Sequence, residues 1–196
     1  MHSIRILALV ASLLPAAILA QQAQPLGAQL RVRWKDFNII VMKDGVKHAF
    51  GVDKEFAGGS IESVKLLSAK AAGDFIYLLF DVAGPSRGPE GAAKECGAGT
   101  ERSLIWMKLD AAWNKVGSQS FAIESCWDAA SLDSEGAPLT FTGPDLVARG
   151  TTFRAPPDKE NTMGSHKWMH YEIKYSIKHP ENGLGINLVP GESAPH

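Results

Sequence analysis

The chain has 196 residues, of which 45% are hydrophobic and 21% are charged, and its formal net charge is −1 at pH 7. So balanced a charge argues against nucleic acid or an anionic membrane as the natural partner, and no basic run interleaved with aromatic residues is present. The composition is that of an ordinary globular protein, long enough to bury one hydrophobic core.

The first twenty residues have the pattern of a secretory signal peptide. Arg5 is followed by an uncharged, largely apolar run of about fifteen residues, from Ile6 to Ala20, which ends in small residues. This run is shorter than the roughly 20 residues that a membrane-spanning helix needs, so an uncleaved anchor is the lesser alternative. We predict cleavage after Ala20, with Ala23 as the alternative site.

The predicted organisation is therefore a signal peptide over 1–20, a single β-rich domain over 21–190 and a disordered tail over 191–196. The expected location is secreted or periplasmic, with no membrane insertion after cleavage of the signal peptide.

Alternation of apolar and polar residues dominates after residue 30 and predicts β-strands. Residues 37–52 are expected to form a hairpin around Lys43-Asp44-Gly45, because Asp-Gly supplies the positive φ that a tight turn requires. Residues 75–80 are continuously apolar, which is typical of a central strand covered on both faces. Further strands are expected at 61–69, 74–82, 103–110, 119–127, 168–178 and 184–189, with two or three brief ones within 137–161.

Helical periodicity is weak throughout, and about ten short strands are separated by turn signals. This pattern predicts an all-β fold, an antiparallel β-sandwich or barrel. Two or three blades of a propeller-like array are the lesser alternative.

Cys96 and Cys126 are the two cysteines of the chain. In an oxidising compartment they are expected to form one disulfide, and closing a loop of roughly 30 residues would contribute roughly 3–4 kcal/mol. Antiparallel pairing of the strands at 103–110 and 119–127 would bring them together. The alternative, a catalytic thiol with a histidine base, would require a reduced cysteine in that compartment.

His166 and His170 are four residues apart, the spacing of zinc-binding pairs on a helix. The surrounding alternation predicts a strand instead, in which positions four apart are separated by roughly 13 Å, too far for one metal ion. We therefore expect solvent-facing polar residues here, with His170 and Glu172 as a surface pair, and no metal site.

Carboxylates could carry chemistry if two of them converge. Glu101 and Glu124 are the pair that the expected hairpin brings nearest, and two carboxyl groups about 5–9 Å apart can hydrolyse a glycosidic bond. The favoured interpretation of both residues is that they are solvated surface carboxylates. The motifs of a serine nucleophile, a phosphate loop and a dinucleotide site are absent, so the sequence indicates no cofactor.

Two further residues are candidate ligand contacts. Trp113, at the expected hairpin tip, could stack on a sugar or anchor a partner, although a local hydrophobic contact is the favoured alternative. Arg87 belongs to the glycine-rich loop 84–100, and loops on rigid scaffolds often carry binding.

These observations favour a non-catalytic, exported domain that binds an unidentified protein or glycan through loop 84–100. The alternatives are a secreted hydrolase using paired carboxylates such as Glu101 and Glu124, and a subunit of a cell-envelope assembly. The assembly alternative predicts an exposed apolar edge strand. The sequence does not decide whether the protein is an enzyme, although the absence of catalytic motifs favours a protein that is not one.

Overall fold

The computed structural model describes residues 24–26, 29–86, 99–155 and 166–191. These residues form an all-β structure with antiparallel pairing throughout, and their helical structure is limited to short 3-10 turns such as η3 (Pro180–Asn182). No helix within these described ranges is long and apolar enough to cross a membrane.

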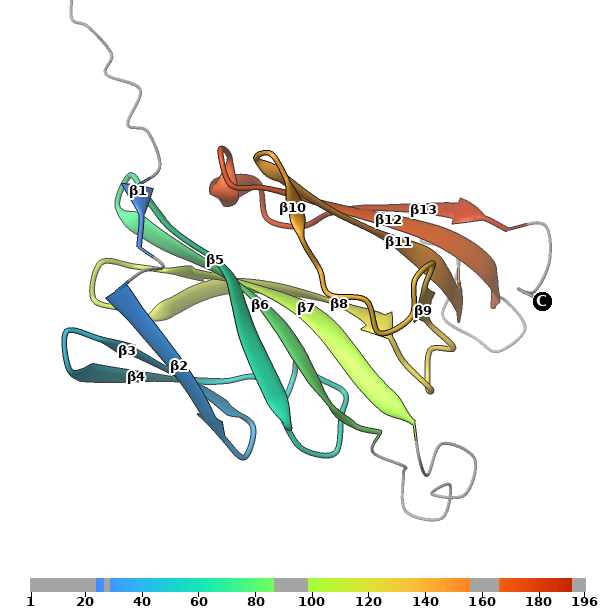
Figure 1. Ribbon diagram of the computed structural model, residues 1–196, viewed down its shortest axis with the longest axis horizontal. Helices are drawn as coiled ribbons and strands as arrows, with labels where there is room; N and C mark the ends of the chain where they lie inside the picture. The colour runs from blue at the N-terminus through green and yellow to red at the C-terminus, as the bar shows by residue number, and fades with distance from the viewer. Residues whose placement is uncertain (1–23, 27–28, 87–98, 156–165, 192–196) are drawn as a thin grey trace, which may run out of the picture.

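The strands form three sheets (Figure 1). In spatial order, the central sheet contains β1 (Gln24–Pro25), β5 (Ser63–Ala72), β6 (Phe75–Pro85), β7 (Thr100–Leu109) and β8 (Lys115–Glu124). The small sheet contains β2 (Leu30–Lys35), β3 (Asn38–Lys43) and β4 (Val46–Gly51). The third sheet contains β10 (Phe141–Thr142), β11 (Asp145–Arg154), β12 (Lys167–Ser176) and β13 (Gly185–Pro190), with β9 (Ser131–Leu132) also paired to β11.

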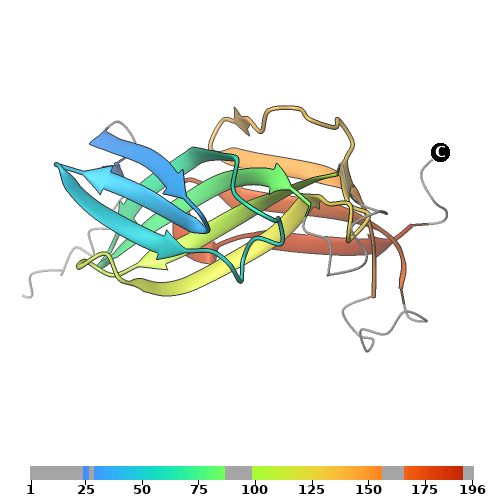
Figure 2. The same ribbon diagram turned by 90° about the horizontal axis from the view of Figure 1, so that it is seen from below.

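The central sheet lies between the other two, so it buries side chains on both faces (Figures 1 and 2). On β6, Ile76, Leu78 and Phe80 point toward the small sheet and belong to what we call the N-terminal core. Tyr77 and Leu79 point the other way, into the C-terminal core beneath the third sheet. Because successive strand residues alternate faces, burial on both sides explains the continuous apolar run at 75–80, and the prediction of a central strand there is confirmed.

Tight turns lie where the sequence places them. Asp44 and Gly45 have φ values of 51° and 82° and join β3 to β4, which confirms the predicted hairpin. Gly73, with φ of 58°, lies in the turn between β5 and β6.

The predicted all-β antiparallel class is confirmed. The arrangement has three sheets, whereas a simple sandwich has two and a barrel is one closed sheet. The thirteen strands of the described residues exceed the expected ten because β1, β9 and β10 contain two residues each. The proposed signal peptide and residues 192–196 of the predicted tail lie outside the described ranges. Gly191, the first residue of that predicted tail, is described, and its amide donates to the Trp168 carbonyl at 2.8 Å.

Candidate functional site

The loop predicted to carry binding, residues 84–100, is described only at its two ends. Arg87, Cys96 and the rest of 87–98 lie outside the described residues, so the predictions made for them stay predictions. At the described ends, Pro85 pairs with Thr100 across β6 and β7, and the Ser86 amide donates to the Gly99 carbonyl at 2.9 Å. The loop therefore leaves and re-enters the central sheet at neighbouring points.

Glu101 is buried beside this loop, with 1% of its surface exposed. Its Oε1 atom accepts hydrogen bonds from the Ser86 hydroxyl at 2.7 Å and from the Cys126 amide at 3.1 Å. The Oε2 atom is buried without a hydrogen-bond partner. The carboxyl group thus connects the start of the loop, the start of β7 and the segment after β8.

Glu124 belongs to a buried ion network on the opposite face of the central sheet. Arg102 donates to both oxygens of Asp81 at 2.9 and 2.8 Å, and its Nη1 atom contacts Glu124 Oε2 at 3.3 Å. The same nitrogen donates to the Ala137 carbonyl at 3.0 Å, while the Gly136 amide donates to Glu124 Oε1 at 2.6 Å. The hydrogen bonds from Arg102 to Asp81, which burial only partly offsets, raise the pKa of the guanidinium.

The structure does not bring Glu101 and Glu124 together as a catalytic pair. Glu101 and Arg102 are consecutive on β7, so their side chains leave the sheet on opposite faces, and Glu124 is paired with Arg102. A cavity of about 450 Å³ beside β8 is lined by Glu124, Cys126 and Glu135, but not by Glu101. Convergence in one cleft, which carboxylate hydrolysis needs, is not met by these two residues.

Trp113 is packed inside the structure. It is 9% exposed, has a φ of 66°, and stacks on His48 with ring centroids 4.4 Å apart. Lys43 Nζ lies 5.8 Å from the centroid of its ring. The indole therefore forms a packing contact between the β7–β8 turn and the small sheet. This is the local hydrophobic contact considered in the sequence analysis, and it leaves the ring faces covered and not exposed to a ligand.

The two histidines lie at the start of β12. His166 precedes the strand and its ring lies 5.7 Å from that of Phe153, whereas His170 points outward from the third sheet, in register with Thr151. Within the part of the chain that the structure describes, no group of three or more His, Cys, Asp or Glu residues could hold a metal ion.

A pocket of about 220 Å³ lies on the outer face of the third sheet. Strand register puts Arg149 of β11 opposite Glu172 of β12, which lies opposite Asn187 of β13. The lining of the pocket is completed by His170 and Val189 on the same strands, by Asp133, and by Gly150 and Tyr171. The sequence pattern identified the outward residues of β12, but not the neighbours that the two adjacent strands supply.

Glu172 is held as an anion at the centre of this row. Its Oε2 atom accepts from Arg149 Nε at 2.7 Å, and its Oε1 atom lies 2.6 Å from Lys174 Nζ. These contacts, with Lys174 first and Arg149 second, lower the pKa of Glu172 below its usual range. Both cations are exposed, and each contacts a different oxygen of the carboxylate.

An aromatic group continues the same face toward the start of β12. Phe153 and Trp168 are paired across β11 and β12, and their rings are tilted by 52° with centroids 5.4 Å apart. Both side chains are half-buried. Trp168 and Glu172 are four residues apart on one strand, roughly 13 Å by strand rise, so the aromatic group lies at one end of the polar row.

Comparisons with known proteins return nothing for this chain: no family model, no curated protein and no solved structure matches it.

Proposed function

We propose that this protein is an exported, non-catalytic binding domain that holds a neutral glycan on the outer face of its third sheet. The observation that carries the proposal is the 220 Å³ pocket lined by Arg149, His170, Glu172 and Asn187. Side chains that donate and accept hydrogen bonds alternate across three adjacent strands there, which is the complement of a ligand rich in hydroxyl groups.

The charges around the pocket favour a neutral ligand. Arg149 and Lys174 contribute two positive charges, and Glu172 and Asp133 contribute two negative ones. An ionic ligand would gain no net attraction from this set, whereas a polyol needs only fixed donors and acceptors. The ion pairs hold the polar groups in place before a ligand arrives, which reduces the ordering cost of binding.

The size of the pocket favours one unit of a longer chain. It is smaller than the roughly 300–1,000 Å³ of sites that enclose a whole small molecule. A glycan lying along β12 could place one sugar in the pocket and another near Trp168, whose ring offers an apolar surface for stacking. This extends the binding surface beyond loop 84–100, whose central residues the structure does not describe.

The export signal over 1–20 and the disulfide remain part of this proposal. A Cβ atom placed on Gly99 would lie 2.8 Å from Cys126 Cβ and 3.3 Å from its Sγ. The chain three residues after Cys96 therefore passes directly beside Cys126. This proximity supports a Cys96–Cys126 bridge that would anchor the loop next to Glu101.

A second candidate, a subunit of a cell-envelope assembly, is favoured by one specific observation. β13 lies at the end of the third sheet in its strand order, and Ile186 and Val189 on it are 41% and 50% exposed. An exposed edge with apolar side chains can pair with another chain. Size-exclusion chromatography with light scattering would separate an assembly from a monomer.

The glycan proposal is tested by affinity electrophoresis of the purified protein in gels that contain laminarin, xylan or galactomannan. We expect at least one polysaccharide to retard the protein, and Trp168→Ala or Asn187→Ala to weaken the affinity about tenfold or more, as expected for an anchoring contact. Val116→Ala, an exposed change on β8, is the matched control and should leave retardation unchanged.

Two outcomes would contradict the proposal. The first is no retardation by any of the three polysaccharides, or equal retardation of the wild type and both site variants. The second is steady release of new reducing ends from a retarding polysaccharide, which would show that the protein is a hydrolase.

A further inference from the structure

The outer face of the small sheet is basic, although the chain as a whole is nearly neutral. Arg31, Arg33 and Lys35 alternate along β2 and point away from the N-terminal core, and all three are exposed. Lys47 of β4 shares this face, because register places Arg31 opposite Met42 and Met42 opposite Lys47. A net charge of −1 conceals this concentration of positive charge on one surface.

Neither strand partners nor ion pairs neutralise these four cations. The acidic residues nearest in sequence, Asp36 and Asp44, lie in the two turns that join the strands. Among the described residues, none of the ion pairs involves Arg31, Arg33, Lys35 or Lys47. The positive field of this face therefore extends into solvent over about one Debye length.

The middle strand of the face is apolar. Ile40 and Met42 of β3 are half-buried and lie between the basic side chains of β2 and β4, next to the exposed Ala49. Across the sheet, the positive charges therefore lie on the two flanking strands, β2 and β4, and the apolar side chains lie on the middle strand, β3. A linear polyanion would favour a continuous basic groove, whereas this arrangement matches an anionic surface with hydrocarbon beneath it.

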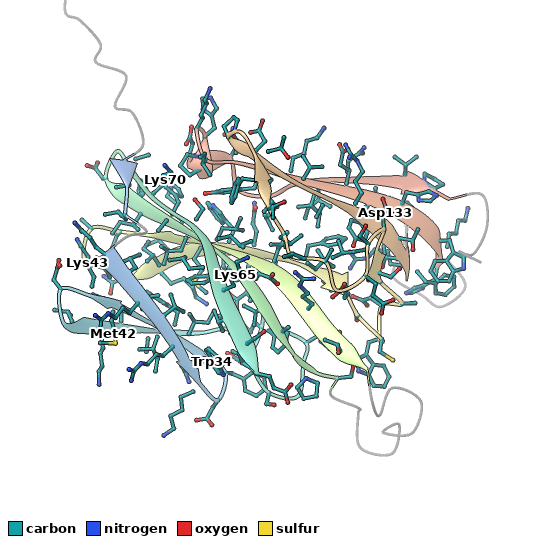
Figure 3. All side chains as sticks on the ribbon, in the orientation of Figure 1. Trp34, Met42, Lys43, Lys65, Lys70 and Asp133 are labelled. Carbon is teal, nitrogen blue, oxygen red and sulfur yellow. The ribbon has the colours of Figure 1, made fainter. Side chains whose placement is uncertain are left out.

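We infer that the outer face of β2, β3 and β4 docks the protein on the surface of an anionic lipid bilayer. The arginine and lysine side chains would contact lipid phosphates while their aliphatic stems and Met42 rest on the interfacial region. This surface is distinct from the proposed glycan site, since Figure 3 shows Met42 on the small-sheet side and Asp133 on the third-sheet side, with the central sheet between them. A protein docked in this way would keep the pocket on the third sheet away from the bilayer.

The test is co-sedimentation of the purified protein with vesicles of pure phosphatidylcholine and with vesicles that contain phosphatidylglycerol at three parts in ten. We expect binding to the anionic vesicles only, with loss of binding at high salt. Each basic residue near the surface contributes about fivefold in partition coefficient, so Arg31→Gln/Arg33→Gln should weaken binding about 25-fold.

The matched control is Lys167→Gln/Lys178→Gln, which removes the same charge from the third-sheet side of the molecule and should weaken binding by less than about fivefold. Equal loss in the two double variants would overturn the inference, as would equal binding to both kinds of vesicle. Binding to heparin without binding to anionic vesicles would also overturn it, in favour of a soluble polyanion. The salt dependence of the wild type tests the inference even if a variant fails to fold.

Discussion

The two faces of the central sheet are packed by different means. The N-terminal core consists of aliphatic, phenylalanine, methionine and tryptophan side chains. The C-terminal core contains all three tyrosines of the chain and has polar contacts within it. Tyr171 donates to the Ile123 carbonyl at 2.7 Å, Tyr175 to Ser68 at 3.2 Å, and Trp106 Nε1 to the Pro180 carbonyl at 2.9 Å.

This difference determines how each outer sheet is oriented on the central one. Apolar packing is non-directional and tolerates changes that conserve volume. A buried hydroxyl or guanidinium bonds only one set of partners, and leaving such a group without them is costly. We therefore expect the third sheet to be held in a defined orientation by the buried hydrogen bonds of Tyr171, Tyr175 and Trp106. The small sheet should be held mainly by packing, with polar contacts only at its solvent-facing margin.

The largest effect is expected from removing the cation of the buried network. Arg102→Ala would leave the carboxylates of Asp81 and Glu124 in their buried positions without a counter-ion. The expected loss in the free energy of unfolding is about 3–5 kcal/mol, measured by urea denaturation at pH 7.

Arg149→Ala is the matched control, since Arg149 also pairs with a glutamate but is exposed. Its expected cost is at most about 1 kcal/mol. Similar losses in the two variants would show that the Arg102 network contributes no more than a surface ion pair.

A smaller effect separates the two cores directly. Tyr171→Phe removes one oxygen atom and leaves the carbonyls of Ile123 and Ser131 without the hydroxyl, at an expected cost of about 1–3 kcal/mol. Leu78→Met, at a fully buried position of the N-terminal core, changes shape without removing a hydrogen bond and should cost below about 1.5 kcal/mol. If Leu78→Met proves the more destabilising change in thermal unfolding, the distinction between the cores is wrong.

Local patterns in the sequence predict the strands better than they predict the sheets. The alternation from Met169 to Ile177 identifies the buried face of β12. Its first four inward residues are buried, and Ile177, just after the strand, is half-buried against the same core. The same pattern does not identify the sheet that covers this face, because an alternation of apolar and polar residues indicates that one face is buried but not which strands pack on it. The division into three sheets depends on contacts between residues far apart in the chain.

The candidate sites show the same limit more strongly. Glu101 and Glu124 are close in the hairpin, as expected, but a register shift between Arg102 and Ser103 and the alternation of β7 place them on opposite faces. The pair of Arg149 with Glu172 depends on the register of β11 with β12, which sequence alone leaves open. The basic outer face of the small sheet could not be predicted from the net charge, because acidic residues elsewhere in the chain balance its arginines and lysines.

The smallest predicted effect concerns the link between the small and central sheets at their solvent-facing margin. Glu55, which follows β4, accepts hydrogen bonds from Ser118 at 2.6 Å and Lys115 at 2.9 Å, both on β8. Burial opposes its ionisation, but the bonds from Ser118 and Lys115 outweigh burial and lower its pKa below the usual value of 4.5.

Because the folded state holds this carboxylate at a lowered pKa, the stabilisation is present above the pKa of the unfolded chain. It is lost as the pH falls through the pKa of the folded state. Ser118→Ala should therefore reduce stability at pH 7 by less than about 1 kcal/mol, and the difference from wild type should shrink at pH 3.

Ser120→Ala, two residues along β8 and also exposed, controls for the loss of a serine hydroxyl and should show no such pH dependence. Urea denaturation of both variants at the two pH values gives the comparison. A Ser118→Ala difference that stays constant between pH 7 and pH 3 would mean that the hydroxyl stabilises the fold independently of the Glu55 charge. The charge-dependent part of this link would then rest on Lys115, which donates to Glu55 and to the Gly51 carbonyl.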